Sequence, residues 1–199
     1  MKKFKLTSEF IVDISGVKLF RIKALIEFGN VKAGDLGGYI EKEENLSHMG
    51  DAWVSDDARI SGDARVYGNA WVYGDAQVSG DALVYGNAWV YDNAWVYGNA
   101  QVSGDARVCG DARVCGNGDY AYAHGFGSVN RTTTFFRLKD GGVGVRCGCF
   151  YGTLAQFRDK IRETHGETKK AQEYLMLADL MELRFEEDEN EVGNRKYVE

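Results

Sequence analysis

A short repeat, Gly-Asp/Asn-Ala-x-Val-x, runs without a slip through residues 51–118. The fifth position of this hexad is always valine or, once, isoleucine: Val54, Ile60, Val66, Val72, Val78, Val84, Val90, Val96, Val102, Val108 and Val114. Because side chains alternate along a strand, each repeat would supply a short strand with its valine pointing inward. Gly-Asp and Gly-Asn would then turn the chain, since these residues tolerate left-handed backbone angles. A fixed hexad period predicts a parallel β-helix.

The repeat resembles the left-handed β-helix of hexapeptide-repeat proteins, many of which are acyltransferases. This resemblance implies a left-handed coil closed by three hexads, and hence about four coils here. A closer resemblance involves Asn30–Ile40, Asn45-Leu46-Ser47 and Gly50–Val54, which look like the N-terminus of the bacterial YdcK-like β-helix proteins. It covers roughly residues 4–118. Proteins of that kind carry transferase labels on the basis of their fold, and related phage and prophage proteins are labelled polymer-forming cytoskeletal proteins.

Side chains that point outward would stack in columns, with one member from every third hexad, if three hexads close a coil. One such column and its flank hold Trp53, Trp71, Trp89, Arg107, Tyr73 and Tyr91, and a neighbouring column holds Trp95. The aromatic column rivals the ~300–600 Å² apolar patch that a monomer usually exposes. We therefore expect the C-terminal helices or another subunit to cover it. Simple stacking of aromatic side chains along the solenoid is the alternative interpretation.

The segments that flank the repeat indicate a covering structure at each end. Residues 1–45 predict a β cap, with a hairpin of Phe10–Ile14 and a strand from Val17 onward, followed by a bent lead-in from Val31 to Ile40. The repeat itself would occupy residues 46–118. An exposed solenoid end needs such a cover, because its unpaired strand edges would otherwise recruit other chains.

Residues 119–185 predict a hairpin and two helices, and residues 186–199 an acidic tail. The region would begin with a connector, Tyr120–Asn130, and continue with hairpin strands Thr132–Lys139 and Val143–Phe150. A capping box from Thr153 to Gln156 would start the first helix, with Leu154, Phe157 and Ile161 buried and Gly166 at its end. The second helix, about Thr168 to Phe185, is apolar over a wide arc. This width predicts burial on two sides, with Leu175 and Met181 in contact with a partner.

Composition narrows the class of partner. The net charge is −6, from 24 basic and 30 acidic residues, which argues against a nucleic-acid partner. No segment has the length and apolarity of a membrane span or of a signal peptide's apolar region, so we expect a cytoplasmic protein without a membrane partner. Cys147 and Cys149 do not form a metal site by spacing alone, so we expect no metal and no cofactor.

Candidate residues for chemistry are few. His124, which lies among glycines, is the best candidate for a catalytic residue, whereas His48 and His165 are better explained as structural. Arg131, Thr132 and Thr133 combine a cation with hydroxyl groups and form a candidate ligand site for an anion. Acyl transfer from acyl-CoA usually relies, in the hexapeptide-repeat family, on a histidine near a loop between coils. No histidine occurs between His48 and His124, which counts against that chemistry.

We therefore expect a non-catalytic β-helix protein that forms a homo-oligomer, a trimer by family resemblance, and binds a partner. That partner would be a host protein or a small, nucleotide-like signalling ligand, and a phage-encoded version would act against host defence. One alternative is an acyltransferase that uses acyl-CoA at a subunit seam near His124. Another alternative is a filament-forming scaffold, although covered solenoid ends would oppose it.

Overall fold

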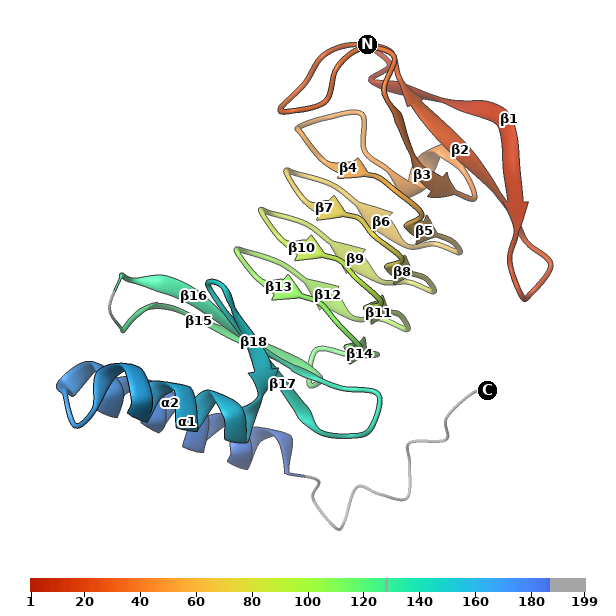
Figure 1. Ribbon diagram of the computed structural model, residues 1–199. Coiled ribbons are helices and arrows are strands. Elements are labelled where there is room, and N and C mark those ends of the chain that lie inside the picture. The colour runs from red at the N-terminus through yellow and green to blue at the C-terminus, as the bar shows by residue number, and fades with distance from the viewer. Residues whose placement is uncertain (128, 187–199) are drawn as a thin grey trace.

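The hexad repeat forms a β-solenoid of about four coils in the computed structural model, which describes residues 1–127 and 129–186 (Figure 1). Each hexad contributes one short strand. These strands are β4 (Trp53–Val54), β5 (Arg59–Ile60), β6 (Arg65–Val66), β7 (Trp71–Val72), β8 (Gln77–Val78), β9 (Leu83–Val84), β10 (Trp89–Val90), β11 (Trp95–Val96), β12 (Gln101–Val102), β13 (Arg107–Val108) and β14 (Arg113–Val114). The alanine and the valine or isoleucine of these hexads are fully buried. The predicted β-helix is thus confirmed.

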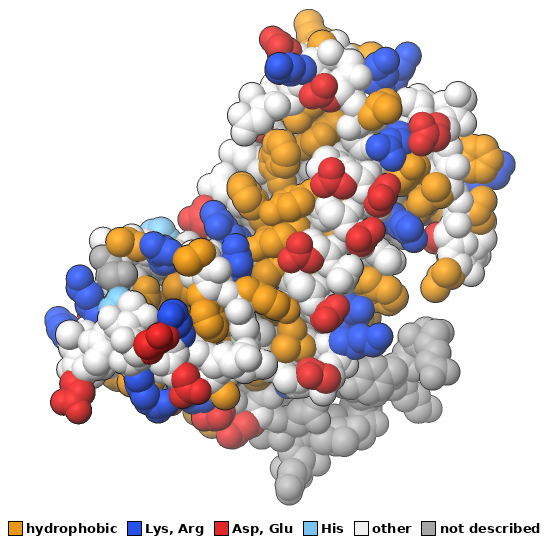
Figure 2. All heavy atoms as spheres, viewed as in Figure 1, with side chains coloured by type: hydrophobic (Ala, Val, Ile, Leu, Met, Phe, Trp, Pro, Cys, Tyr) orange, Lys and Arg blue, Asp and Glu red, His pale blue; other side chains and the backbone are white. Residues whose placement is uncertain are grey.

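The strands pair in parallel with their counterparts in the next coil. Trp53 lies opposite Trp71 and Trp71 opposite Trp89, so that three hexads make one coil, as the family resemblance implied. The stack β4, β7, β10 and β13 carries the outward column Trp53, Trp71, Trp89 and Arg107, with Tyr73 and Tyr91 beside it, and is called the aromatic face below. Figure 2 shows apolar side chains running down the solenoid in this region, bordered by acidic ones.

The N-terminal segment extends another of the three stacks. β1 (Phe4–Val12) and β2 (Lys18–Ala24) form an antiparallel hairpin, and β3 (Leu36–Ile40) joins β2 to β5 of the first coil. The hairpin therefore starts at Phe4, well before the predicted Phe10. Gly38 in β3 must be glycine because a Cβ atom there would lie 2.6 Å from the carbonyl oxygen of Ala58. This close approach explains the glycine-rich lead-in that the sequence shows.

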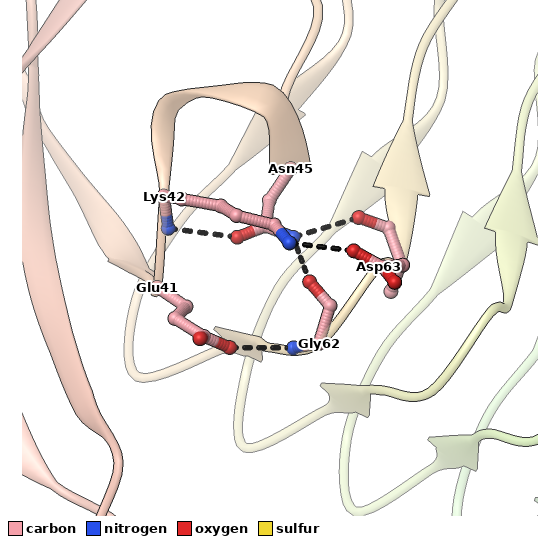
Figure 3. A network of polar contacts seen from close by, with 6 residues as sticks. Glu41, Lys42, Asn45, Gly62 and Asp63 are labelled. Atoms are coloured by element: carbon pink, nitrogen blue, oxygen red, sulfur yellow. Dashed lines mark hydrogen bonds and ion pairs between the residues drawn. The ribbon is translucent and has the colours of Figure 1, made fainter.

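A buried asparagine completes the hydrogen bonding of the first coil. Within the solenoid, N–H groups of one coil donate to carbonyls of the next, so the first coil's carbonyls need other donors. Asn45, in the short helix η1 (Glu43–Asn45), is fully buried, and its Nδ2 donates to Gly62 O at 3.0 Å and Ala64 O at 2.8 Å (Figure 3). Its Oδ1 accepts the N–H of Lys42, and the Glu41 carboxylate accepts the N–H of Gly62.

A buried lysine donates hydrogen bonds to carbonyl groups at another corner of the first coil. The Nζ of Lys3 donates to Ala52 O at 2.7 Å and to Gly50 O at 3.1 Å, and it lies 4.6 Å from the centre of the Phe28 ring. Burial lowers the pKa of Lys3 to about 8, and the nearby Asp51 carboxylate offsets this only in part. The end of the solenoid is therefore closed by specific donors and not by apolar contact alone.

The lowered pKa of Lys3 predicts a pH dependence of stability. Between about pH 8 and the ordinary lysine value of 10.5, the unfolded chain binds more protons than the folded one, so the free energy of unfolding rises with pH there. Relative to a Lys3→Met variant, the wild-type protein should therefore gain stability from about pH 8 to about pH 10 and show a constant difference below about pH 7. Urea unfolding of both proteins measures this difference. A difference that does not change with pH would show that Lys3 keeps an ordinary pKa.

The C-terminal module is a four-stranded antiparallel sheet covered by two helices. Its strands are β15 (Tyr120–Phe126), β16 (Arg131–Arg137), β17 (Val143–Cys147) and β18 (Phe150–Thr153), and its helices are α1 (Leu154–His165) and α2 (Lys169–Phe185). The capping box at Thr153 and the end of α1 at Gly166 agree with the prediction. Most of the predicted connector is instead strand β15. The predicted strand 143–150 is broken at Gly148, whose positive φ turns the chain into β18.

Strand β16 joins the module to the solenoid because its two sides face different cores. Phe136 is fully buried in the solenoid core, whereas Phe135 is buried beneath the helices. Thr134 Oγ1 accepts the N–H of Arg107 at 2.9 Å. Figure 1 shows the module at the base of the solenoid, projecting to one side.

Two further expectations concern the chain as a whole. Within the described residues, no helix has the length and apolarity needed to cross a membrane. The predicted acidic tail, 186–199, lies outside the described residues from 187 onward.

Candidate binding surfaces

The aromatic face is covered at its N-terminal end and open further along. Trp53 is only 2% exposed, because the Phe28 ring packs against it at a centroid distance of 5.3 Å. The prediction that Trp53 lies in an interface is therefore wrong, since the chain's own N-terminal segment covers it. Trp71 is half-buried and Trp89 is 38% exposed, so these two remain accessible to a partner.

The tyrosines beside this column stack on each other. The rings of Tyr73 and Tyr91 lie 4.9 Å apart and are parallel within 1°. Tyr91 is buried, with the Arg146 guanidinium 5.9 Å from its ring centre, so its predicted role in an interface is also wrong. Burial raises the pKa of Tyr73 and of Tyr91, and that of the neighbouring Cys109 thiol. These groups are therefore neutral near pH 7.

Trp95 belongs to a different face of the solenoid. It lies in the stack of β5, β8, β11 and β14, and the guanidinium of Arg113 lies 4.4 Å from its ring centre. Its exposure is similar to that of Trp89, whose ring carries Arg107 at 4.8 Å. The chain thus has two similar Trp–Arg pairs on different faces, and the backbone N–H of Arg107 is the one that donates to the Thr134 hydroxyl of β16.

The acidic residues at the border of the aromatic face serve first as turn formers. They are Asp56, Asp57, Asp75, Asp92 and Asp111. Asp56 and Asp92 stand where other hexads have glycine and have φ values of 55° and 57°. Their carboxylates accept N–H groups of the next coil, from Gly74 and Gly110 respectively. These hydrogen bonds explain why aspartate is tolerated in the left-handed region.

Helix α2 is apolar on two opposite sides, of which one is buried in its own module, while burial of the other by a partner stays a prediction. One side packs in the module core through Ala171, Tyr174, Ala178, Met181 and Phe185. The opposite side presents Met176, Leu180 and Leu183, which are 71%, 54% and 68% exposed. We call these three residues the α2 stripe. Met181 was predicted in an interface and is instead buried within its own module, while Leu175 is half-buried against that core.

The residues predicted to bind a ligand separate onto two sides of the module sheet. Thr133 is buried and donates to Cys147 Sγ at 3.2 Å, so its assignment as a ligand residue is wrong. Thr132 Oγ1 lies 2.9 Å from Nδ1 of the exposed His124. A Cβ atom on Gly148 would collide with Arg131, so this guanidinium lies against the turn between β17 and β18.

A cationic site that the sequence did not predict forms where the module meets the aromatic face. Thr134 binds the backbone of Arg107, and Arg146 lies opposite Thr134 in the neighbouring strand β17. The Arg107 guanidinium lies 4.8 Å from the Trp89 ring and the Arg146 guanidinium 5.9 Å from the Tyr91 ring, and the Tyr73 ring contacts both of these rings. Arg107 was visible as a member of the aromatic column. Arg146 could not have been found, because only the docking of the module brings it to the solenoid.

The contacts of His48 and His165 are explained by packing and hydrogen bonding within the fold. The His48 ring stacks on Phe4 at 4.3 Å and contacts Glu43 at 2.7 Å, in keeping with its place at the edge of the first coil. His165 ends α1 and stacks on Tyr174. None of the cysteines forms a disulfide bond within the described residues. Across residues 1–127 and 129–186, no group of three potential ligands is arranged to hold a metal ion.

Comparison with known families bears on the solenoid. Residues 58–74, 76–92, 88–104 and 100–118 match the family described as the YdcK beta solenoid repeat. These matches extend from just before β5 to the end of the last hexad, and so cover most of the repeat region. No curated protein matches the chain. The family description identifies a repeat and specifies no substrate.

Proposed function

We propose that this chain, which carries YdcK-type β-solenoid repeats over residues 58–118, is a non-catalytic binding protein that assembles with copies of itself. The α2 stripe is the observation that carries this proposal. It is a continuous apolar row on the side of the helix that faces away from the module core. The rigid solenoid would then present its faces to a partner or ligand in a fixed arrangement.

The spacing of the stripe suits pairing with a second copy. Its residues lie at i, i+4 and i+7, which places them along one line of the helix. Two such helices packed antiparallel about a two-fold axis would bury six apolar side chains in a self-complementary contact. Burial of six partly exposed side chains is worth on the order of 5–10 kcal/mol before the cost of association, which is itself about 4–15 kcal/mol. Because these two ranges overlap, the α2 stripe by itself supports at most a weak dimer, whereas the family resemblance implied a trimer.

Two charged substitutions in the stripe test this assembly. Leu180→Glu with Leu183→Glu should convert the oligomer to a monomer, because burying two carboxylates per subunit costs more than the contact contributes. Native mass spectrometry and light scattering after gel filtration measure the mass. Ala155→Glu with Thr164→Glu adds the same charge to exposed positions of α1 and should leave the assembly unchanged.

The aromatic face offers a competing contact, and the same measurement separates the two. If Trp71→Ala with Trp89→Ala dissociates the oligomer while the stripe variant does not, self-association occurs through the aromatic face. A wild-type protein that is monomeric at all concentrations would exclude self-association altogether. In that case the exposed surfaces would serve only a different partner.

The acyltransferase alternative rests on His124, whose ring contacts only a threonine hydroxyl among the hydrogen bonds of the described residues. Turnover of acetyl-CoA that is lost in a His124→Ala variant would support it. The filament alternative is opposed by the two covered ends, where Lys3 and Asn45 close the first coil and β16 closes the last.

We further propose a cytoplasmic location, because thiols such as those of Cys147 and Cys149, which form no disulfide, are typical of a reducing compartment.

A further inference from the structure

The module sheet and the aromatic face meet at an angle, and the side chains on the inner side of this angle share a chemistry. Side chains alternate along β16, so Thr132 lies on the same side of the sheet as Thr134, the side that contacts Arg107. His124, which contacts Thr132, and Arg146, which lies opposite Thr134, belong to this side too. The solenoid contributes Trp89 and Arg107. We call the meeting point of these residues the inner corner.

The inner corner carries two guanidinium groups that form no ion pair within the described part of the chain. Among the described residues, no carboxylate lies within ion-pair distance of Arg107 or Arg146. The Nε of Arg146 is buried without a hydrogen-bond partner in the described part of the chain, and its Nη1 makes only a long contact of 3.4 Å to Cys149 O. The buried Nε cannot reach a ligand, but Arg107 is exposed and the Nη2 of Arg146 makes no hydrogen bond among the described residues, so these two groups keep donors.

The aromatic face beside the inner corner stacks planar groups. Tyr73 and Tyr91 show that planar side chains stack along the solenoid axis, one coil above the next. The Arg107 guanidinium continues the Trp89 column in the same way, at 4.8 Å from the Trp89 ring. A guanidinium plane stacks well on aromatic rings. The column ends at Arg107, because β13 is the last strand of the aromatic face and the module follows.

We propose that the inner corner binds a small phosphorylated ligand with a planar ring, of the nucleotide class. The ring would stack on the Trp89–Arg107 column. The phosphate would accept hydrogen bonds from the Arg107 and Arg146 guanidinium groups and from the hydroxyl of Thr132, which are donors that suit its oxygens. This inference rests on the proposed binding role and adds the ligand class. The acidic border, including Asp92 and Asp111, disfavours a long polyanion and limits the site to a small one.

Isothermal titration calorimetry of the full chain with ATP, ADP, AMP and inorganic phosphate tests the inference. We expect a nucleotide to bind more tightly than inorganic phosphate, with affinity that falls as salt rises. Arg107→Gln with Arg146→Gln should weaken binding at least tenfold, since the two changes remove the charge-assisted hydrogen bonds of both guanidinium groups. Arg113→Gln is the matched control, because Arg113 stacks on Trp95 as Arg107 does on Trp89 but on another face.

A further variant at Arg107 distinguishes the contribution of ring stacking to ligand binding from that of charge. It also tests the site without a change at Arg146, in case that residue is needed for folding. Arg107→Lys keeps the charge and removes the planar group, so it should weaken nucleotide binding while leaving binding of inorganic phosphate nearly unchanged. Equal loss in the Arg113→Gln control, or no binding of any of the four probes, would overturn the inference. The stripe substitutions in α2 should leave nucleotide binding intact, so failure of self-association and failure of this site can be told apart.

Discussion

Replacing Asn45 by aspartate should lower the free energy of unfolding by roughly 3–5 kcal/mol, the cost of an unpaired buried charge. The side chain is fully buried, and its amide donates to two carbonyl oxygens, those of Gly62 and Ala64. Aspartate has the same shape but only oxygen atoms at its end. It would therefore leave both carbonyls without a donor and bring a negative charge against them.

The control for this change lies in the same column of the solenoid. Asn99 stands nine hexads, and therefore three coils, beyond Asn45, and its side chain is exposed. Asn99→Asp should cost less than about 0.5 kcal/mol, as surface substitutions usually do. Urea unfolding followed by circular dichroism measures both variants. Equal losses in the two proteins would mean that Asn45 does not close the first coil.

Replacing Phe136 by alanine should cost about 3–5 kcal/mol, the usual range for a buried phenylalanine. The ring is fully buried, and it belongs to the solenoid core although it comes from a strand of the C-terminal module. Its removal would leave a cavity beneath the last coil. We also expect the last coil to open locally, because β16 supplies the groups that close it.

Hydrogen exchange measured by mass spectrometry distinguishes this local effect from general destabilisation. Amides of β13 and β14 should exchange faster in Phe136→Ala than those of β4 and β5. Phe126→Ala removes the same ring from a position that is 40% exposed and should cost much less. Uniform exchange along the whole solenoid would show that Phe136 does not hold the module to the last coil.

The sequence predicted the repeat, the cap and the helices well, because each follows from a local pattern. The hexad determined the inward valines, the capping box located the start of α1, and the arc of α2 predicted its two apolar sides. Strand β15 was missed because Gly125 and Gly127 suggested an irregular connector, although β16 supplies a strand partner. The turn at Gly148 was missed because the residues around it alternate like one continuous strand.

The exposure of the site residues was harder to predict from the sequence, because it depends on contacts between segments that are distant in the chain. Trp53, Trp71 and Trp89 are equivalent in sequence, but the N-terminal segment covers Trp53 with the Phe28 ring and with Gly37 of β3. Thr132 and Thr133 are adjacent, and the side of β16 that faces the helices decides which one is buried. The inner corner requires Arg146 to meet Arg107, although one belongs to the module and the other to the last coil. No pattern in the sequence specifies that approach.

The number of coils between the two closed ends sets the distance between the surfaces that those ends carry. The groups that cap the first coil and those that cap the last coil do not touch each other, because coils of the same three-hexad length lie between them. Adding or removing one coil would shift the N-terminal hairpin relative to the α2 stripe by one step of ~4.8 Å. Each cap would still meet the same hexad pattern after such a change. The distance between the surfaces at the two ends can therefore vary in fixed increments while each surface keeps its own structure.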